Sequence, residues 1–597
     1  MEGCAMKIIL PGIFVILNLV LSANAGIIHV PADYRTIQAG INAAVTGDTV
    51  LVADSTYYEN IDFKGKRITV ASWFILDQDT THINSTIIDG SQPANPELGS
   101  VVTFSGGEDT TSVICGFTIT GGTGSFVVPA NNVWAGGGIL CSNAGARICH
   151  NKIINNVVQS PSEADGGGIS QGPPNVNTWL VIENNVISAN YVSGSTYAFG
   201  GGIEILGNAR IVNNTISTNE IYSSSNWAPG AGIYFGSDST LVNRRKIEIT
   251  GNKIIYNSAQ SDASLGAWGG VHGVGSRAVI KDNHIEYNTV KSAGTCYGAG
   301  LDLVRLGSGS WVSGNVIRYN QVLEGNCYGG GLRCADGNYP VSNNIIAYNT
   351  AMDGAGVLIY LTARIDFMNN TVYGNTASRL GGGLYIEDAV CEIKNSIIRE
   401  NLSNSSIQIY AAPTGTLNCS YSNIARGWVG TGNIDIVPDF VDMEDFHLQP
   451  NSPSVDQGDP DQAFNDREDA SHPGYAMLPA QGSIRNDMGA YGGQASLLTA
   501  VKPLNHPTLP SSVELRQNYP NPFNPSTSIE FILPRSEFVT VKVYNILGKE
   551  VETLVSKKLD SGNHTYRFDG KNLASGIYYY QLVAGEYREV KKMILIK

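Results

Sequence analysis

The chain has few charged side chains, and those it has are mostly acidic. Only 15 % of its 597 residues are Asp, Glu, Lys or Arg, and the formal net charge at pH 7 is −14. Contacts with nucleic-acid phosphates need surfaces rich in Lys and Arg, so nucleic acid is not expected as a partner. The same shortage of positive charge argues against unaided binding of strongly anionic glycans.

Long apolar runs are scarce as well. One run, residues 8–21, follows Lys7 and ends in Ala23-Asn24-Ala25, a small-x-small pattern before Gly26. This arrangement predicts a secretion signal over residues 1–25. The run is too short for a membrane span, and no other segment qualifies, so we expect no transmembrane segment in the mature chain.

Helix-length periodicity is also missing, and in its place a short pattern recurs nine times between Gly136 and Asn401. Each copy opens with a turn of small residues and one aliphatic residue, as in Gly136-Gly137-Gly138-Ile139. The turns begin at Gly136, Gly166, Gly200, Gly230, Gly269, Gly298, Gly329, Gly354 and Gly381. A fixed motif with spacers of variable length is typical of a solenoid whose insertions lie in loops.

Each copy ends in a pair of asparagines, five residues apart in the first eight copies and six in the ninth. The pairs are Asn151/Asn156, Asn185/Asn190, Asn214/Asn219, Asn252/Asn257, Asn283/Asn288, Asn315/Asn320, Asn344/Asn349, Asn370/Asn375 and Asn395/Asn401. Stacked asparagines form ladders of side-chain amides. Asn also tolerates the left-handed backbone that a sharp turn requires. We therefore expect both asparagines of each copy to lie in turns.

Aliphatic residues recur at fixed offsets from these asparagines, for example Ile148, Ile182 and Ile211 three positions before the first of each pair. Three short β-rich segments per copy, separated by Gly and Asn, predict three strands per coil. Stacked coils would place Ile on Ile about 4.8 Å apart, so nine coils would form a rod of about 43 Å.

This pattern resembles right-handed parallel β-helix proteins of the pectate lyase type over residues 26–493. The resemblance supplies the handedness. Residues 36–45 read as an amphipathic helix that would cover the open end of the first coil, since an uncovered sheet edge invites aggregation. The expected fold is all-β, with an N-terminal cap and first coils over 26–135 and the β-helix repeats over 136–425.

The cysteines have no metal-type spacing. Cys296 and Cys327 occupy the same place in neighbouring copies, where a disulfide is sterically suitable and an exported protein permits one. Two thiols near solvent are the alternative. Five others fall in strand contexts and are expected to be small apolar core residues: Cys115, Cys141, Cys149, Cys334 and Cys391.

Past the repeats, the chain is expected to close the β-helix over residues 426–498 and to continue through a Pro-containing linker, 499–512. Alternating strands over 513–597 predict a small antiparallel β-sandwich of the immunoglobulin-like kind. This segment closely resembles the type A sorting domain of the type IX secretion system in Asn518-Tyr519-Pro520-Asn521-Pro522-Phe523-Asn524-Pro525, Ser575-Gly576-Ile577-Tyr578 and residues 591–597. The resemblance implies export through the type IX machinery, removal of the domain and attachment to the cell surface. An accessory binding domain is the alternative.

An acidic loop lies within the closing segment. Clustered carboxylates in a loop rich in Pro and Gly are able to bind Ca²⁺ through oxygen ligands, although the spacing is not that of an EF-hand. A solvated acidic loop explains the cluster equally well. The candidate ligands are Asp456, Asp459, Asp461, Asp466 and Asp469, with Glu468 among them.

The residue after each aliphatic turn residue should point outward and form a row along the solenoid, which we call the central row. It runs Leu140, Ser170, Glu204, Tyr234, His272, Asp302, Arg333, Leu358 and Tyr385. Four of these are candidate catalytic residues: Glu204, His272, Asp302 and Arg333.

Neighbouring places in this row suggest roles for the candidates. Asp302 would orient His272 and raise its pKa, making it a better base, and Arg333 would neutralise a sugar carboxylate. Glu204 and Asp302 lie three coils apart, about 14 Å, which exceeds the carboxylate separation of glycosidases. β-Elimination therefore fits better. A strand face of mixed charges in cross-strand pairs is the alternative.

Aromatic residues lie in the turn before the same strand. Such side chains stack on sugar rings beside a groove, or else cover the turns of the solenoid. The candidate binding residues are Trp134, Phe199, Trp227, Tyr234, Trp268, Tyr297 and Tyr328.

The motifs of the known enzymes of this fold are missing: the Gly-His-Gly with a nearby Asp-Asp pair of polygalacturonases, the aspartates and glutamine of pectin methylesterases, and the arginine signature of pectate lyases. The sequence thus leaves enzymatic activity undecided. It favours an exported, surface-attached β-helix protein that binds extracellular polysaccharide. The alternatives are a polysaccharide lyase acting on uronate-containing glycans, and a passive surface-layer or adhesin component.

Overall fold

The computed structural model describes residues 25–172, 178–236, 245–264, 266–405 and 408–494. Towards the C-terminus it describes residues 513–515, 518, 521, 523, 525–533, 537–545, 549–559, 562–571, 573–585 and 587–595. The predicted linker and residues 1–24 of the predicted signal peptide lie outside this part. The chain divides into two compact units, residues 1–498 and 499–597. Among the described residues no helix is both long and apolar enough to cross a bilayer.

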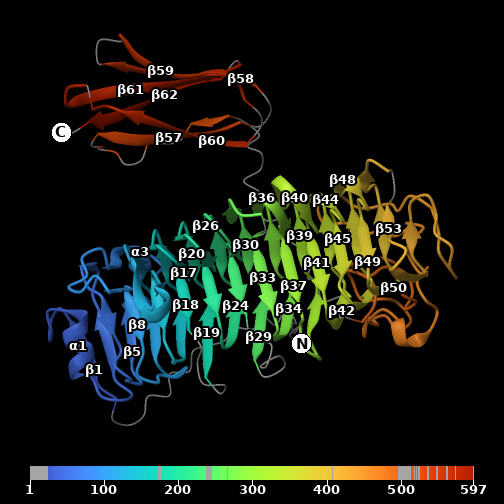
Figure 1. The fold of residues 1–597 in the computed structure, drawn as a ribbon, viewed down its shortest axis with the longest axis horizontal. Coiled ribbons are helices and arrows are strands. Elements are labelled where there is room, and N and C mark those ends of the chain that lie inside the picture. Colours follow the sequence, from blue (N-terminus) through green and yellow to red (C-terminus); the bar gives the residue numbers. More distant parts are fainter. Residues whose placement is uncertain are drawn as a thin grey trace, which may run out of the picture. The chain divides into compact units, whose positions relative to one another are not determined.

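The first unit is a parallel β-helix, as predicted (Figure 1). One coil contains β13 (Ile139–Cys141), β14 (Ala146–Cys149), β15 (Lys152–Ile154), β16 (Val157–Ser160) and β17 (Glu163–Asp165). Each of these strands pairs in parallel with its counterpart one coil further on. In the part of the chain that the structure describes, the three long sheets contain 14, 13 and 12 strands.

The candidate site lies on the sheet of 12 described strands, which begins at β4 (Ile61–Asp62) and β8 (Val102–Phe104). Its further strands are β13, β18 (Ile169–Gln171), β23 (Ile203–Ile205), β28 (Ile233–Phe235), β33 (Val271–Val274), β37 (Leu301–Val304), β41 (Leu332–Ala335), β45 (Val357–Tyr360), β49 (Leu384–Glu387) and β53 (Ile409–Ala411).

The interior is built from the aliphatic ladders that the sequence predicts. Ile153, Ile187 and Ile216 are consecutive register partners, and each is fully buried. Because one position of the repeat becomes one row of the core, the apolar side chains form a single continuous cluster along the coils.

The prediction of three strands per coil is incomplete. A fourth parallel sheet of nine described strands begins at β16, β21 (Tyr191–Gly194) and β26 (Glu220–Ser223). In most copies the residue two positions after the asparagine pair is apolar and buried, as Val158 and Val192 are. These segments therefore also form half-buried strands.

Both asparagine ladders are present. Asn185 Oδ1 accepts hydrogen bonds from the backbone N and the Nδ2 of Asn151, at 2.9 and 3.2 Å. Asn185 Nδ2 donates to the Ile148 carbonyl at 2.8 Å. The same contacts repeat from coil to coil with buried side chains.

Two details of the ladders differ from the prediction. In the ninth copy, Asn395 is not the first ladder residue. In addition, the residue with the left-handed backbone in each turn is not the asparagine of the ladder. Asn370 N donates to Ser396 Oγ, so Ser396 continues the ladder and stands five residues before Asn401. Asn395 has a φ of 52° and occupies the left-handed position before it. Elsewhere, too, the left-handed residue precedes the ladder asparagine, as His150 and Asn184 show.

A short helix covers the first coil as predicted. Helix α1 (Ile37–Ala43) begins at Thr36, whose side chain accepts a hydrogen bond from Ala39 N, and it buries Ile37 and Ile41. Two shorter helices, α2 (Phe74–Asp77) and α3 (Thr81–Ser85), follow β5 (Thr69–Ser72).

The closing segment folds back along the side of the solenoid. Asn343 Nδ2 donates to the carbonyls of Ala490 and Gly492, at 3.0 and 2.7 Å. The buried guanidinium of Arg318 lies between Glu286, 3.2 Å away, and Glu444, 2.8 Å away. A buried charge flanked by opposite charges fixes the segment against these coils.

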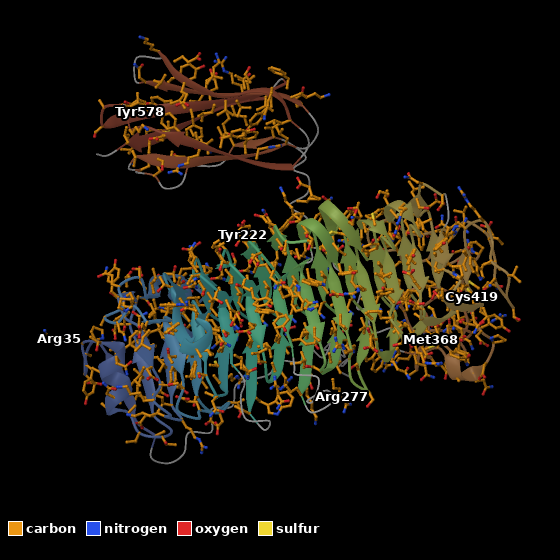
Figure 2. The ribbon with its side chains drawn as sticks, viewed as in Figure 1. Arg35, Tyr222, Arg277, Met368, Cys419 and Tyr578 are labelled. Atoms are coloured by element: carbon orange, nitrogen blue, oxygen red, sulfur yellow. A yellow bond between two sulfur atoms is a disulfide. The ribbon has the colours of Figure 1, made fainter. Side chains whose placement is uncertain are left out.

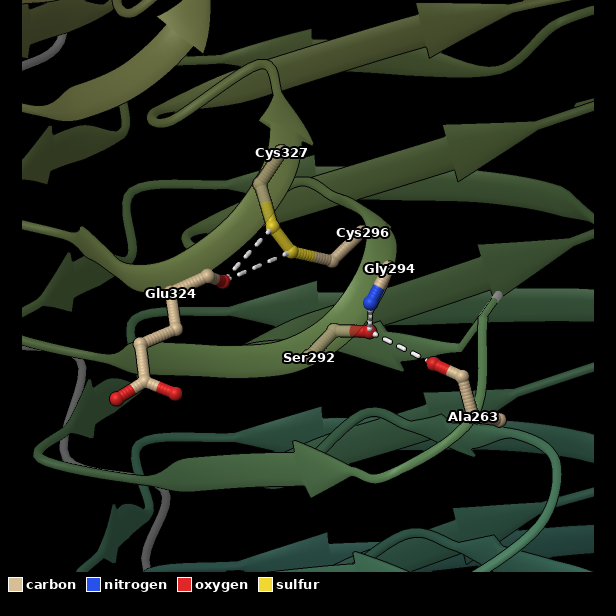
Figure 3. Close-up of a disulfide and its surroundings, with 6 residues drawn as sticks. All are labelled: Ala263, Ser292, Gly294, Cys296, Glu324 and Cys327. Atoms are coloured by element: carbon tan, nitrogen blue, oxygen red, sulfur yellow. Dashed lines mark hydrogen bonds between the residues drawn. A yellow bond between two sulfur atoms is a disulfide. The ribbon is translucent and has the colours of Figure 1, made fainter.

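Cys296 and Cys327 are bonded, as the sequence suggested (Figure 3). They are register partners at the ends of β36 (Thr289–Tyr297) and β40 (Gln321–Tyr328), with Cα atoms 4.3 Å apart. The other described cysteines are buried thiols. Cys115 and Cys149 lie in a separate cluster under Phe74, outside the main core.

The second unit is a sandwich of two antiparallel sheets, as predicted. Its core is separate from that of the β-helix, and Tyr578 is among its buried side chains (Figure 2). Asn518 of the sorting motif is buried there, and its Nδ2 donates to Thr527 Oγ1 at 2.9 Å. The sheets contain β56 (Glu514–Leu515), β57 (Ser526–Leu533) and β60 (Gly562–Asp569), and β59 (Glu550–Leu559), β58 (Glu537–Asn545), β61 (Gly576–Ala584) and β62 (Tyr587–Leu595).

Candidate functional site

The central row is in the predicted register. Each of its residues is the parallel partner of the next one, from Leu140 on β13 to Tyr385 on β49. Glu204 and Asp302 therefore lie three coils apart, on β23 and β37.

The charged members of the row are covered. The exposed fraction is 3 % for Glu204, 7 % for His272, 0 % for Asp302 and 6 % for Arg333. The cover comes from the preceding turn: the Trp268 ring lies 5.1 Å from the His272 ring, and the Arg333 guanidinium lies 3.9 Å from the Tyr297 ring centre. An outward direction on a strand does not make a side chain accessible when the neighbouring turn overhangs it.

Three of the candidate catalytic residues form a buried ion cluster. Asp302 Oδ2 lies 2.6 Å from His272 Nδ1, and Arg333 Nη1 donates to Asp302 Oδ1 at 3.0 Å. Burial raises the pKa of Asp302, but the charges of Arg333 and His272 outweigh it and lower the pKa below its usual value. Removing one partner of this cluster would leave an uncompensated buried charge, so the three side chains hold one another in place.

The aromatic candidates form a nearly continuous band beside the row, which we call the aromatic border: Phe199, Trp227, Tyr234, Trp268, Tyr297 and Tyr328. Ring centres are 4.8 Å apart for Phe199 and Tyr234, 6.2 Å for Trp227 and Trp268, 6.4 Å for Trp268 and Tyr297, and 5.6 Å for Tyr297 and Tyr328. Trp134 lies apart on β12 (Val133–Ala135) and packs against Phe126. Trp227 is 45 % exposed and presents the most open ring of the border.

Glu204, the fourth catalytic candidate, belongs to a different group. It lines a cavity of about 320 Å³ together with Glu163 and Asp165 of β17 and Ser170 of β18. We call this cavity the acidic hollow. Val127, Val128 and Asn131 overhang it from the excursion that β11 (Gly124–Val128) and β12 form at the N-terminal end of the row.

Burial dominates the electrostatics of the acidic hollow. Burial raises the pKa of Glu204 to about 8, although the hydrogen bond from Ser170 Oγ, 2.6 Å long, opposes the shift. Burial and the charges of Glu204 and Glu163 raise the pKa of Asp165 well above its usual value. Asp165 is 6 % exposed, and its Oδ1 has no hydrogen-bond partner. With a pKa of about 8, the carboxyl group of Glu204 holds its proton near neutral pH.

The C-terminal end of the row opens into a second cavity, of about 420 Å³, which we call the tyrosine groove. It combines aromatic rings with polar groups in an open surface depression. Its lining residues are Thr295, Tyr297, Tyr328, Leu358, Tyr360, Arg379, Leu380, Tyr385 and Glu387.

The positive charge of the groove is already paired. Arg379 Nε donates to Asp353 Oδ1 at 2.9 Å, and Leu380 N donates to the same oxygen at 2.9 Å. The bond to Asp353 raises the pKa of Arg379 above its usual value. The side chain of Arg379 is 53 % exposed, so it can donate hydrogen bonds to a ligand in the groove. Because Asp353 compensates its charge, the groove is not strongly cationic.

The predicted calcium ligands do not converge. Asp456 accepts from Ser483 Oγ at 2.7 Å, Asp459 lies 3.0 Å from Lys394 Nζ, and Asp461 caps a short 3₁₀ helix (Gln462–Phe464). Asp466 accepts from backbone amides, and Asp469 pairs with His472 at 2.9 Å. No group of three or more His, Cys, Asp or Glu among the described residues is placed to hold a metal ion. Calcium binding stays a prediction.

The sequence reasoning missed Asp165, Asp353 and Arg379. The two aspartates could have been identified from their position, because each stands directly before a glycine turn. Phe199, the register partner of Asp165, occupies the same position in its own copy and was predicted as a binding residue. The ion pair between Asp353 and Arg379 joins neighbouring coils. It could not be predicted without knowing the register of β44 (Thr350–Asp353) and β48 (Thr376–Leu380).

Comparison with known families assigns the second unit. Residues 517–597 match the secretion system C-terminal sorting domain. This domain indicates type IX export and anchoring, and it points to a secreted, cell-surface location. Comparisons with curated proteins and with solved structures find no match for the chain.

Proposed function

We propose that the β-helix of this exported protein binds extracellular polysaccharide, and that the tyrosine groove is its principal contact with the glycan. The observation that carries the proposal is the lining of that groove. Four tyrosines, Tyr297, Tyr328, Tyr360 and Tyr385, surround about 420 Å³ together with the donors of Arg379.

The composition of the groove suits sugars. The apolar faces of tyrosine rings pack against sugar rings, and their hydroxyls and the guanidinium supply hydrogen bonds to sugar hydroxyls. The aromatic border continues from Tyr297 toward Trp227 and offers further rings along the axis of the coils. A polymer with repeating units matches a surface that repeats with the coil.

Binding to immobilised and soluble polysaccharides tests the proposal. The full-length protein should be retained on at least one member of a panel of neutral and uronate-containing glycans. Replacing Tyr328 with Ala removes one ring of the groove and should weaken the affinity about tenfold, which corresponds to about 1.4 kcal/mol. The matched control is Tyr58→Ala, at a 60 % exposed tyrosine far along the chain from the groove.

Two results would contradict groove binding. One is retention that Tyr328→Ala and Tyr360→Ala leave unchanged. The other is no retention on any glycan, which would favour a passive surface-layer role.

Cleavage by β-elimination is a second candidate, favoured by the contact of Asp302 with His272 Nδ1, which leaves Nε2 as the basic atom. The reaction also requires that Trp268 and Tyr297 uncover His272 and Arg333. Release of unsaturated products from uronate-containing glycans, abolished by His272→Ala, would support it. Unchanged glycan after incubation with the wild type would argue against it.

A further inference from the structure

The acidic hollow gathers three carboxyl groups without a positive partner. Among the described residues that line it there is no Lys, Arg or His. Glu204 and Asp165 are almost fully buried, and they come from adjacent coils, whose backbones lie about 4.8 Å apart. Elsewhere on this face the buried carboxylates are paired: Asp302 with Arg333, and Asp353 with Arg379.

Asp165 points to a ligand. Asp165 lines the hollow, and its buried Oδ1 has no hydrogen-bond partner, which costs free energy that native structures rarely leave uncompensated. Its neighbour Glu204 does have a partner, the hydroxyl of Ser170 at 2.6 Å. The carboxyl group of Asp165, a residue that lines a hollow with room for a small group, is therefore left partly unpaired.

We propose that the acidic hollow is a subsite for a cationic group of the bound polysaccharide, the ammonium of an amino sugar. An ammonium group has three donors and one positive charge, so it would donate to the carboxyl groups of Asp165 and Glu204 and compensate one negative charge between them. The volume of about 320 Å³ lies at the small end of ligand sites and suits one sugar unit. The inference rests on the proposed glycan binding for the nature of its ligand.

Other occupants fit less well. A uronate would place a further negative charge beside three carboxyl groups, and no cation lines the hollow to receive it. A divalent metal requires several converging carboxylates, and the described residues contain no group of three placed for this.

Binding should release protons. In the free protein burial raises the pKa of Glu204 to about 8 and also raises the pKa of Asp165 above its usual value, so the hollow holds at least one proton near neutral pH. An ammonium ion favours the carboxylate form, so its arrival should expel about one proton per site. A surface that merely attracts cations would bind the same sugar without this release.

Calorimetry on the full-length protein tests the inference. A β-1,4-linked glucosamine oligomer and the N-acetylated oligomer of equal length are titrated at pH 5.5 in buffers of different ionisation enthalpy. We expect the glucosamine oligomer to bind at least tenfold more tightly and to release about one proton. Asp165→Asn should abolish both the preference and the release, and Glu204→Gln should weaken both. The matched control is Asp262→Asn, an exposed carboxylate that pairs with Tyr222.

Several outcomes would overturn the subsite. These are equal affinity for the two oligomers, no proton release, or an unchanged preference in both Asp165→Asn and Glu204→Gln. Tight Ca²⁺ binding that Asp165→Asn abolishes would identify a metal site instead, and equal binding of Nα-acetyl-lysine methylamide would identify a site for peptides.

The proposed glycan binding and the proposed subsite are tested by separate measurements. Retention of neutral polysaccharide and its loss in Tyr328→Ala report on the tyrosine groove alone. If retention persists and the glucosamine preference is missing, only the subsite fails.

Discussion

At the scale of single residues, the asparagines connect each coil to the next. Asn257 Oδ1 accepts from the backbone N and the Nδ2 of Asn219, and its own Nδ2 donates to Asn288 Oδ1 and the Ile216 carbonyl, with all four distances at 3.0 Å. The amide thus satisfies buried groups in the coils on both sides. The asparagine amide supplies two donors and an acceptor on a short side chain, which suits that place.

Replacing Asn257 with Ala should destabilise the β-helix by about 3 kcal/mol, because several buried polar groups lose their partners at once. The melting temperature and the urea midpoint of the full-length protein measure the effect. The control is Lys253→Ala, an exposed residue on β30 (Lys253–Ile255), for which less than about 0.5 kcal/mol is expected. Equal shifts in the two variants would refute the role of the ladder.

At the scale of elements, the closing segment depends on carboxyl groups that stay protonated. Burial, with the nearby charge of Asp487, raises the pKa of Asp466 to about 8, and burial raises the pKa of Asp487 to about 7. Asp466 also accepts a hydrogen bond from the Asp487 backbone, 3.1 Å long. In the unfolded chain both groups ionise near pH 3.9, so the folded state binds more protons over the range between.

The sign of the pH dependence follows from these raised pKa values. The contribution of these two groups to the stability of the closing segment should be greatest below about pH 4, should be lost progressively as the pH rises from there, and should be fully lost above about pH 8. Hydrogen exchange of residues 454–493 between pH 6 and 9, corrected for the intrinsic rate, should show falling protection, and Asp466→Asn should flatten the fall. Asp469→Asn is the control, because hydrogen bonds with Ser471 and His472 lower the pKa of that partly exposed group to about 2. An equally steep fall in Asp466→Asn would rule out this origin.

At the scale of the whole molecule, the chain combines a parallel β-helix with an export domain. The two units have separate hydrophobic cores. Residues 517–597 match the sorting domain, which indicates that this unit directs export and anchoring. The location of the protein and the proposed binding surface are therefore encoded in different parts of the chain.

Deleting residues 513–597 should retain the protein in the periplasm and leave the melting temperature of the β-helix within a few degrees of that of the intact chain, because no core residue of the solenoid is removed. Cell fractionation and calorimetry measure the two effects. A matched variant that deletes the β11–β12 excursion, residues 124–135, should still be exported. Surface display of the truncated chain would contradict the assignment.

The repeat predicted the architecture well, because in a solenoid a single sequence position generates a whole row. The register of the central row, the ladders and the covering helix α1 all follow from spacing. Spacing did not identify Ser396 as a ladder residue, because a hydroxyl there replaces an amide and the neighbouring Asn395 resembled the motif. The fourth sheet was missed because its strands are only partly buried, as in β16 and β21.

The sequence by itself thus determined the stacking of coils, the inward and outward faces of each strand and the identity of the sorting domain, because all three are fixed by local patterns. Only the tertiary structure decided which outward residues meet solvent. It covered His272, Asp302 and Arg333 and left the tyrosine groove open. The physical reason is that accessibility depends on how far each turn overhangs the next strand, a distance set by loops of variable length and not by the repeat.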